Sequence, residues 1–421
     1  MGRLRRQETT TAANSWCAGR LLHAAAWFFA SCPDDARWYD GCFIQHMYWE
    51  TLVDNADFCV RRSGRYLVTE LRTPHRVIST SVCNGGQSEK IRFLVNHQSC
   101  EGSGHHDRAA CLIKMGLENY HRSICHDLDL PVEETASMGT AANMNYAVIR
   151  QCGSDDISVT AIVTAGVQGN AACAGDPATW AETPREPSEA VLQNGTINIE
   201  LLLSCPVATG ALSRAVVTMT EAKSAALQQL AVRSRYSMEP ATGTTTDQFC
   251  VAACLEGPAP RWYTSTGTKL GEYIGTSVRD ATLEALRWHN GLEASYTRGL
   301  FHVLGAYGMK EDRFLPEIAP YLTDSELELL KKNCNAVMYE PIVASAAYAL
   351  AGILDRYRYG VFPASAAQEA LRQQAASLAA SLAGRVDRWP EFHAGLPEVD
   401  LEHPKQLILA AIALGWSKKW S

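Results

Sequence analysis

The feature that most constrains this chain is the segment 197–272, in which a long helical pattern is followed by polar turns. Residues 209–232 contain no proline and are rich in Ala, Val, Met and Leu, which predicts one long helix. Two charged residues near the middle of this run, Glu221 and Lys223, interrupt it. Because positions i and i+2 of a helix point to different sides, we expect one of the two to face a site and the other to face solvent.

Two Thr-Gly-Thr turns follow the predicted helix, within residues 241–247 and 265–272. Glycine lets a backbone approach a ligand closely, and successive backbone N–H groups can cradle its polar atoms. The turns lack the spacing of nucleotide-binding loops, so a bound nucleotide is not expected. They therefore predict contacts to some other polar ligand.

The periodicity of the whole chain predicts an α+β fold, with a mixed β-sheet core and packed helices, followed by an all-helical C-terminal region. We divide the chain into a weakly ordered lead-in (1–40), one α+β domain (41–290) and a helical domain or cap (291–421). In the α+β domain a polar loop is expected over 96–107, and a short Ser-Arg-Tyr-Ser strand after the long helix. The other expected strands are 66–71, 76–82, 144–152, 157–166, 194–204 and 246–254, and the other helices are 108–128 and 269–289.

Composition limits the partners of the chain. Its 421 residues are 20% charged with a net charge of −7, and Lys and Arg form no block beyond the first six residues. A basic face for nucleic acid is therefore not expected. No segment offers the roughly 20 apolar residues of a membrane span.

The 14 cysteines show no Cys-x-x-Cys motif and predict free thiols in a reducing cytoplasm. The N-terminus is basic, and Phe29-Ala-Ser-Cys32 is similar to a lipoprotein cleavage box. His23 interrupts the apolar run before it, so we prefer a lead-in to an export signal. The oligomeric state is not predicted.

Polar residues after the second predicted strand could carry acid–base or nucleophilic chemistry, in which an activated nucleophile, a site for negative charge and a proton donor act together. Asn84-Gly85-Gly86 offers backbone N–H groups and a side-chain amide, either for an oxyanion or for a substrate amide. His97 is the candidate general base, because its ordinary pKa lies near neutral pH. Ser81 and Cys83 are candidate nucleophiles, although we prefer a directly activated water.

Two acidic residues, Asp247 and Glu272, accompany the Thr-Gly-Thr turns. Either could hold a water or an amine and assist proton transfer. Glu272 also fits a simpler role, since an acidic residue in the first turn of a helix compensates the helix dipole.

The stretch after His97 is rich in metal-capable side chains, but standard zinc-site spacing is absent. A bound transition metal is therefore an open alternative to a set of loop histidines and buried cysteines. The candidate ligands are His97, Cys100, His105, His106, Asp107, Cys111, His121, Cys125 and His126.

Seven motifs, in order over roughly residues 45–290, resemble the adenosylcobinamide amidohydrolases of the CbiZ type. They are Ser81-Val-Cys-Asn-Gly-Gly86, Asn96-His-Gln98, Val163-Thr-Ala-Gly-Val-Gln-Gly-Asn170 with Ala174-Gly-Asp176, Gly195-Thr-Ile-Asn198, Thr220-Glu-Ala-Lys223, Ala241-Thr-Gly-Thr-Thr-Thr-Asp247 and Thr266-Gly-Thr-Lys-Leu-Gly-Glu272. The Cys/His-rich stretch departs from the family pattern, and residues 291–421 are not matched by it.

The resemblance implies a corrinoid-salvage hydrolase that cleaves adenosylcobinamide to adenosylcobyric acid and 1-amino-2-propanol. A corrinoid is then the expected partner, and no cofactor is required. The catalytic residues would be His97, Asn84, Asp247 and Glu272. The substrate contacts would come from Gly85, Gly86, Asn170, Asn198, Glu221, Thr244, Thr266, Gly267, Thr268 and Lys269.

Two alternatives stay open at this point. One is a metal-dependent enzyme of the same fold that acts on a different amide. The other is a corrinoid-binding protein without catalytic activity, in which the helical C-terminal region forms a lid or a partner surface.

Overall fold

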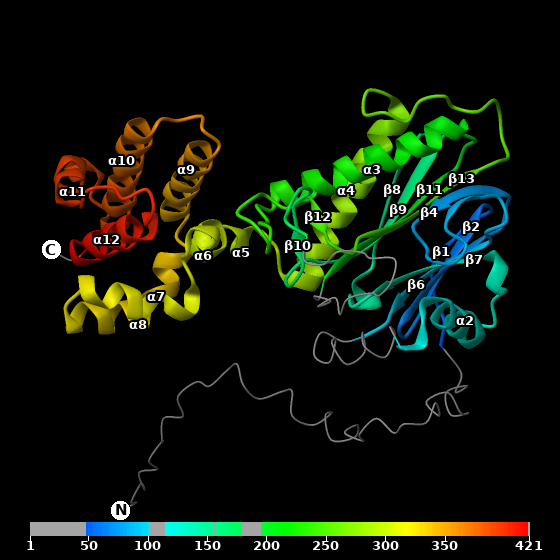
Figure 1. Cartoon of the computed structure of the whole chain (residues 1–421), viewed down its shortest axis with the longest axis horizontal. Coiled ribbons are helices and arrows are strands. Elements are labelled where there is room, and N and C mark those ends of the chain that lie inside the picture. The colour runs from blue at the N-terminus through cyan, green and yellow to red at the C-terminus, as the bar shows by residue number, and fades with distance from the viewer. Residues whose placement is uncertain (1–47, 101–113, 155, 179–194, 420–421) are drawn as a thin grey trace, which may run out of the picture. The chain divides into compact units, whose positions relative to one another are not determined.

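The computed structural model describes residues 48–100, 114–154, 156–178 and 195–419. Both strands and helices occur up to residue 290, and only helices follow, as the sequence predicted (Figure 1). The lead-in expected over residues 1–40 lies outside the described residues. The strands are β1 (Glu50–Asp54), β2 (Phe58–Ser63), β3 (Tyr66–Leu71), β4 (His75–Ser79), β5 (Gly86–Ser88), β6 (Phe93–Gln98), β7 (Thr135–Thr140), β8 (Val148–Gly153), β9 (Ser158–Gly166), β10 (Ala171–Ala172), β11 (Thr196–Leu203), β12 (Gly243–Thr244) and β13 (Gln248–Cys254).

The strands form two large mixed sheets and one small one. The first large sheet has the order β1-β2-β3-β6-β7, the second has the order β5-β4-β13-β11-β9-β8, and β10 pairs with β12. The parallel pairs are β6 with β7 and β11 with β13, and the other neighbours are antiparallel. Parallel strands need a crossover between them, and α3 (Thr209–Gln229) supplies it for β11 and β13.

The two large sheets pack face to face, and helices cover their outer faces (Figure 1). Leu94 of β6 and Leu202 of β11 share the core between the sheets. Val95 faces the other way and packs with Ile124 of α2 (Leu117–Asp127). Leu201 faces outward from the second sheet into the core under α3 and α4 (Lys269–Asn290). The layers are therefore helix, sheet, sheet and helices.

Both helices on the second sheet follow from local sequence. Helix α4 begins at Thr268, whose hydroxyl accepts a hydrogen bond from the backbone N–H of Gly271 at 3.1 Å. It ends at Gly291, whose φ of 64° is the left-handed conformation that glycine adopts at helix ends. Helix α3 buries a face of Ala, Leu and Met on the sheet.

The helices after residue 290 have a core of their own, which includes Leu300, Phe314, Leu350, Leu378 and Trp416. They are α5 (Ala294–Thr297), α6 (Leu300–Leu304), α7 (Glu311–Ile318), α8 (Asp324–Met338), α9 (Pro341–Arg358), α10 (Ala364–Ala383), α11 (Trp389–Gly395) and α12 (Pro404–Ser417). Helix α8 begins at Asp324, where Thr323 and Glu326 form a capping box. The division of the chain at residue 290 stays our proposal.

Two local predictions were wrong. Asn96, His97 and Gln98 belong to β6 and not to a polar loop, because they extend a strand that pairs on both sides. The Ser-Arg-Tyr-Ser stretch after α3 forms bends, and its side chains make hydrogen bonds in place of a ladder. The predicted helix over 108–128 is confirmed as α2 at Leu117–Asp127, and residues 108–113 lie outside the described residues.

Within the described ranges, no helix by itself is long and apolar enough to cross a membrane. Helices α8 and α9 satisfy that requirement only as a pair, and they are bent by 76° at their junction.

Candidate functional site

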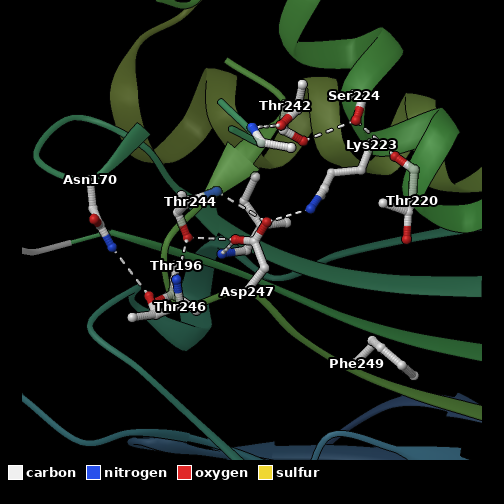
Figure 2. Close-up of polar contacts among 12 residues, drawn as sticks. Asn170, Thr196, Thr220, Lys223, Ser224, Thr242, Thr244, Thr246, Asp247 and Phe249 are labelled. Atoms are coloured by element: carbon white, nitrogen blue, oxygen red, sulfur yellow. Dashed lines mark hydrogen bonds and ion pairs between the residues drawn. The ribbon is translucent and has the colours of Figure 1, made fainter. Parts of the chain in front are cut away.

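Asp247 lies just ahead of β13 and gathers donors from the surrounding elements (Figure 2). Its Oδ1 accepts the backbone N–H of Ile197 at 3.0 Å and the hydroxyl of Thr244 at 2.5 Å. Its Oδ2 accepts the backbone N–H of Thr244 at 3.1 Å. Charge-assisted hydrogen bonds of this kind fix a carboxylate in one orientation. The first Thr-Gly-Thr turn therefore folds around Asp247.

Lys223 on α3 completes this arrangement through an ion pair with Asp247 Oδ2. The two side chains are only 12% and 17% exposed. Glu221 is exposed, so the prediction that one of the two charged residues faces solvent is confirmed. As a contact to ligand, Glu221 is thus the less suitable of the two.

Gly243 allows the turn to approach the ion pair. A Cβ at this position would lie 2.7 Å from Lys223 Nζ and closer still to Asp247 Oδ2. No side chain can occupy that space without displacing the pair. The glycine of this turn therefore serves a close approach, as the sequence suggested, although the groups it approaches are the protein's own.

Asn170 is a second buried node beside Asp247. Its Oδ1 accepts the hydroxyls of Tyr236 at 2.6 Å and Thr245 at 2.8 Å. Its Nδ2 donates to the carbonyl of Gly195 at 2.8 Å and to Thr246 Oγ1 at 3.3 Å. The polar atoms of the Asn170 side chain thus all have protein partners. Asn170 therefore holds the segments beside Asp247 in place.

A pocket of about 670 Å³ opens beside these residues. This volume lies within the range of small-molecule sites in proteins. Hydroxyl groups and one ion pair dominate its polar lining, which suits a ligand rich in amides. The polar side chains include Thr220, Lys223, Ser224, Tyr236, Thr242, Thr244, Thr245 and Asp247.

Asp176 adds a carboxylate to the pocket wall. Burial raises the pKa of this carboxyl, but hydrogen bonds from Ser234, Ser237 and the backbone of Cys173 outweigh burial and lower it. The hydroxyl of Ser234 lies 2.5 Å from Asp176 Oδ2. Asp176 is therefore held as an anion at neutral pH.

His97 does not line the pocket. It faces α2 from the outer side of the first sheet, stacks on Tyr66 with ring centroids 4.6 Å apart, and its Nδ1 lies 2.5 Å from the hydroxyl of Tyr120. Asp247 points to α3 on the outer side of the second sheet. Packed sheets are about 10 Å apart, so His97 and Asp247 are separated by more than that distance.

Asn84 does not line the pocket either, and it lies next to the first sheet. Its Nδ2 donates to the carbonyls of Val132 at 2.7 Å and Thr135 at 2.9 Å, so both amide hydrogens have protein acceptors. Asn84 has a φ of 56°, in the left-handed region. Gly85 packs against Ser81, where a Cβ would overlap the carbonyl oxygen. The predicted oxyanion cradle at Asn84, Gly85 and Gly86 thus has its side-chain amide committed to the fold.

Asn198 and the second Thr-Gly-Thr turn are not at the pocket either. Asn198 points between the two sheets and donates to Asn96 Oδ1 at 2.9 Å, because its neighbour Ile197 takes the outward position in β11.

The second turn, which contains Thr266, Gly267, Thr268 and Lys269, follows the carboxyl end of β13, whereas Asp247 precedes its amino end. Seven residues of strand place them roughly 20 Å apart. Glu272 pairs with Lys269 on an exposed helix start, which matches the simpler role we considered for it.

The metal alternative receives no support from the part of the chain that the structure describes, where no three His, Cys, Asp or Glu side chains are gathered. His121 is buried and bonded to Ser137 and Val132, and His126 is exposed. His105, His106, Asp107 and Cys111 lie outside the described residues.

The pocket contains residues that the sequence reasoning did not choose. Lys223 was signalled by its charge in an apolar helix, and the i, i+2 argument already required either it or Glu221 to face inward. Thr245 and Thr246 belong to a motif that was recognised, but Thr244 alone was chosen. Tyr236 gave no signal, because its stretch was predicted to be a strand.

Comparison with known proteins gives one extensive family match. Residues 50–294 match the model of the adenosylcobinamide amidohydrolase family, CbiZ. The chain is also 33% identical over 181 residues to the uncharacterised protein MJ1613 of Methanocaldococcus jannaschii, which covers 40% of this chain and 69% of that protein.

Two solved structures show a weak likeness. They are the L-aminopeptidase D-Ala-esterase/amidase of Ochrobactrum anthropi, described as a variant of the Ntn hydrolase fold, and the PH0078 protein of Pyrococcus horikoshii. Each is 12% identical over 56% of this chain and 82% of its own, with a TM-score of 0.26. A likeness at this level bears on neither the fold nor the chemistry.

Proposed function

Because the chain belongs to the adenosylcobinamide amidohydrolase family, we propose that it hydrolyses the amide between the corrin propionate and aminopropanol. The products would be adenosylcobyric acid and 1-amino-2-propanol. Family membership makes the chain a corrinoid amidohydrolase in general terms. The specific substrate and products are our proposal. The Lys223–Asp247 ion pair, at the wall of a polar pocket, is the observation that locates the proposed reaction in the fold.

We place the chemistry at Thr244, Asp247 and Lys223. The hydroxyl of Thr244 already donates to Asp247 Oδ1 at 2.5 Å, so its proton has an acceptor in place. In this scheme Thr244 Oγ1 attacks the amide carbon while Asp247 takes the proton. The tetrahedral intermediate then collapses, its C–N bond breaks, and the proton passes to the leaving amine. A water molecule hydrolyses the resulting ester and releases the carboxylate product.

Lys223 would stabilise negative charge during this sequence. Its ammonium group is mostly buried at the pocket, where opposite charges interact more strongly than in bulk water. A directly activated water in place of Thr244 remains the other form of the mechanism, as first preferred from sequence. His97, Asn84 and Glu272 have no part in this scheme, because they lie away from the pocket.

The hydroxyl-rich walls support a substrate with many amides. The corrin ring carries several amide arms, and Thr220, Ser224 and Thr244 offer donors and acceptors to such groups. The pocket's volume suits one arm with its aminopropanol rather than the whole corrinoid, so the ring would lie at the pocket mouth.

The direct test is incubation of the purified protein with adenosylcobinamide, followed by mass-spectrometric detection of both products. Equal amounts of adenosylcobyric acid and aminopropanol are expected. Tight binding without product would favour the corrinoid-binding alternative. Absence of both binding and product would favour a different amide substrate. Turnover of the Thr244→Ala variant then separates the two mechanisms: loss of turnover supports attack by Thr244, and retained turnover supports attack by water.

A further inference from the structure

The segment 233–239 forms one wall of the pocket and follows α3. The hydroxyl of Tyr236 donates to Asn170 Oδ1 at 2.6 Å, and Tyr236 lines the pocket. The hydroxyl of Ser234 donates to Asp176 Oδ2 at 2.5 Å. These contacts tie the inner side of the segment to Asp176, which lines the pocket, and to Asn170, which does not line it.

The outer side of the same segment is tied to α9 of the helical region. The guanidinium of Arg233 donates to both carboxylate oxygens of Asp355, at 3.0 and 2.7 Å. The pair is mostly buried, with the side chains 18% and 14% exposed. Glu239, at the other end of the segment, pairs with Arg358 and accepts the hydroxyl of Tyr359 at 2.6 Å. Side chains of α9, and Tyr359 directly after it, therefore contact the segment at both of its ends.

The backbone of this segment is held by hydrogen bonds outside any helix or sheet: the N–H of Arg235 donates to the carbonyl of Ala171, and the hydroxyls of Ser234 and Ser237 accept neighbouring N–H groups. Between residues 233 and 240 the chain forms bends, and its ladder is limited to one isolated bridge from Arg233 to Pro240. Segments of irregular structure take their conformation from side-chain contacts and open more readily than helices or strands. The position of Tyr236 in the pocket wall thus depends on contacts from both sides.

We propose that α9 holds the pocket wall in place, and that Arg233 and Asp355 are positioning residues for substrate binding. The inference rests on the proposed function of the pocket and extends it to the helical region, which lies beyond the family match at residue 294. In this account the helical region holds Tyr236 and Asp176 in place and contacts no reacting atom.

The test compares Asp355→Asn with Glu328→Gln, which alters an exposed ion pair on α8 of the same region. Amide hydrogen exchange is measured over residues 233–239 without substrate. Informative probes are the N–H of Arg235, which donates to the carbonyl of Ala171 at 2.8 Å, and the N–H of Ser234, which donates to Glu239 at 2.9 Å. We expect faster exchange at both in Asp355→Asn and no change in Glu328→Gln. Unchanged exchange in Asp355→Asn would overturn the proposal.

Steady-state kinetics supply the second readout. Coupling of this kind is expected to raise KM about threefold to thirtyfold in Asp355→Asn, with kcat within about twofold. The same rise is expected in Arg233→Met, and the double variant should be no worse than the poorer single variant, because both changes remove one contact. Lowered thermal stability with unchanged KM would reduce the pair to a structural role and overturn the proposal.

Tyr359→Phe is a milder variant that is expected to fold, because it removes only a hydroxyl contact to Glu239 at a partly exposed position. It should show a smaller change of the same kind. If the wild type turned over no adenosylcobinamide, the proposed reaction would fail, while hydrogen exchange would still decide whether α9 holds the pocket wall.

Discussion

Lys223 on α3 and Asp247 ahead of β13 form an ion pair that is mostly withdrawn from solvent, with side chains 12% and 17% exposed. Both residues belong to motifs that identify the family in sequence, and the fold brings them together at the pocket. Gly243 leaves the space that the pair occupies. The two motifs are therefore one structural unit.

Replacement of Lys223 tests the role of its charge. Lys223→Met should lower kcat/KM by roughly 100-fold or more, as expected for loss of a preorganised charge at a reacting group. Lys269→Met is the matched control, because Lys269 forms an exposed pair at the far end of the sheet and should keep full activity. Product formation at several substrate concentrations gives both values. Equal losses in the two variants would contradict the assignment of the pocket.

A methyl group at Gly243 should disturb the pair without altering any charge. In Gly243→Ala the new Cβ would lie 2.7 Å from Lys223 Nζ, so we expect lower thermal stability and lower kcat. Gly210→Ala is the control, since Gly210 lies in α3 with open space around it. That change should preserve kcat and raise stability by up to about 1 kcal/mol. Thermal unfolding and turnover, measured on both variants, decide the matter.

Glu200 should make the stability of the protein depend on pH. Burial between the sheets raises the pKa of this carboxyl to about 8, although a hydrogen bond from Thr69 opposes the rise. The folded protein then keeps the proton while the unfolded chain loses it near the ordinary pKa of about 4.3. Stability is therefore expected to fall as pH rises from about 4.3 towards 8, by a few kcal/mol in all.

Glu200→Gln should remove most of this dependence, since the amide oxygen can still accept the hydroxyl of Thr69. Its unfolding free energy, measured with urea at a series of pH values, should be flatter than that of the wild type over this range. Glu221→Gln, at an exposed position, should leave the wild-type profile unchanged. Identical profiles for Glu200→Gln and the wild type would show that Glu200 is not held protonated.

His97 tests where the catalytic site lies. The sequence suggested that His97→Ala would lose turnover more than binding. Its position between Tyr66 and Tyr120 now leads us to expect lower thermal stability with kcat changed by less than about threefold. A large loss of kcat at unchanged stability would restore His97 as the general base and count against the pocket at Asp247.

The sequence predicted the individual helices and strands better than it predicted which of their side chains the fold brings together. Helices α3 and α4 and strands β9 and β11 were predicted within a few residues, because apolar periodicity and caps are local signals. The site needed non-local information. Asn198 was chosen for its motif, yet strand alternation turns its side chain between the sheets. Glu272 was chosen for its neighbouring turn, yet β13 separates that turn from Asp247.

The same reasoning explains the residues that were found. Asp247 follows a turn whose glycine and hydroxyls mark a close approach, and that signal is local. Helix geometry alone required either Lys223 or Glu221 to face the site. Tyr236 could not be predicted, because its segment takes its shape from contacts with Asn170 on one side and α9 on the other.

The central claim is that the pocket at Asp247 hydrolyses adenosylcobinamide, and one paired measurement tests it most directly. Release of adenosylcobyric acid is followed by mass spectrometry for the wild type, Asp247→Asn and Glu272→Gln. We expect product from the wild type and from Glu272→Gln, and a loss of at least about 100-fold in Asp247→Asn. Full activity in Asp247→Asn, or loss of activity in Glu272→Gln alone, would contradict the account.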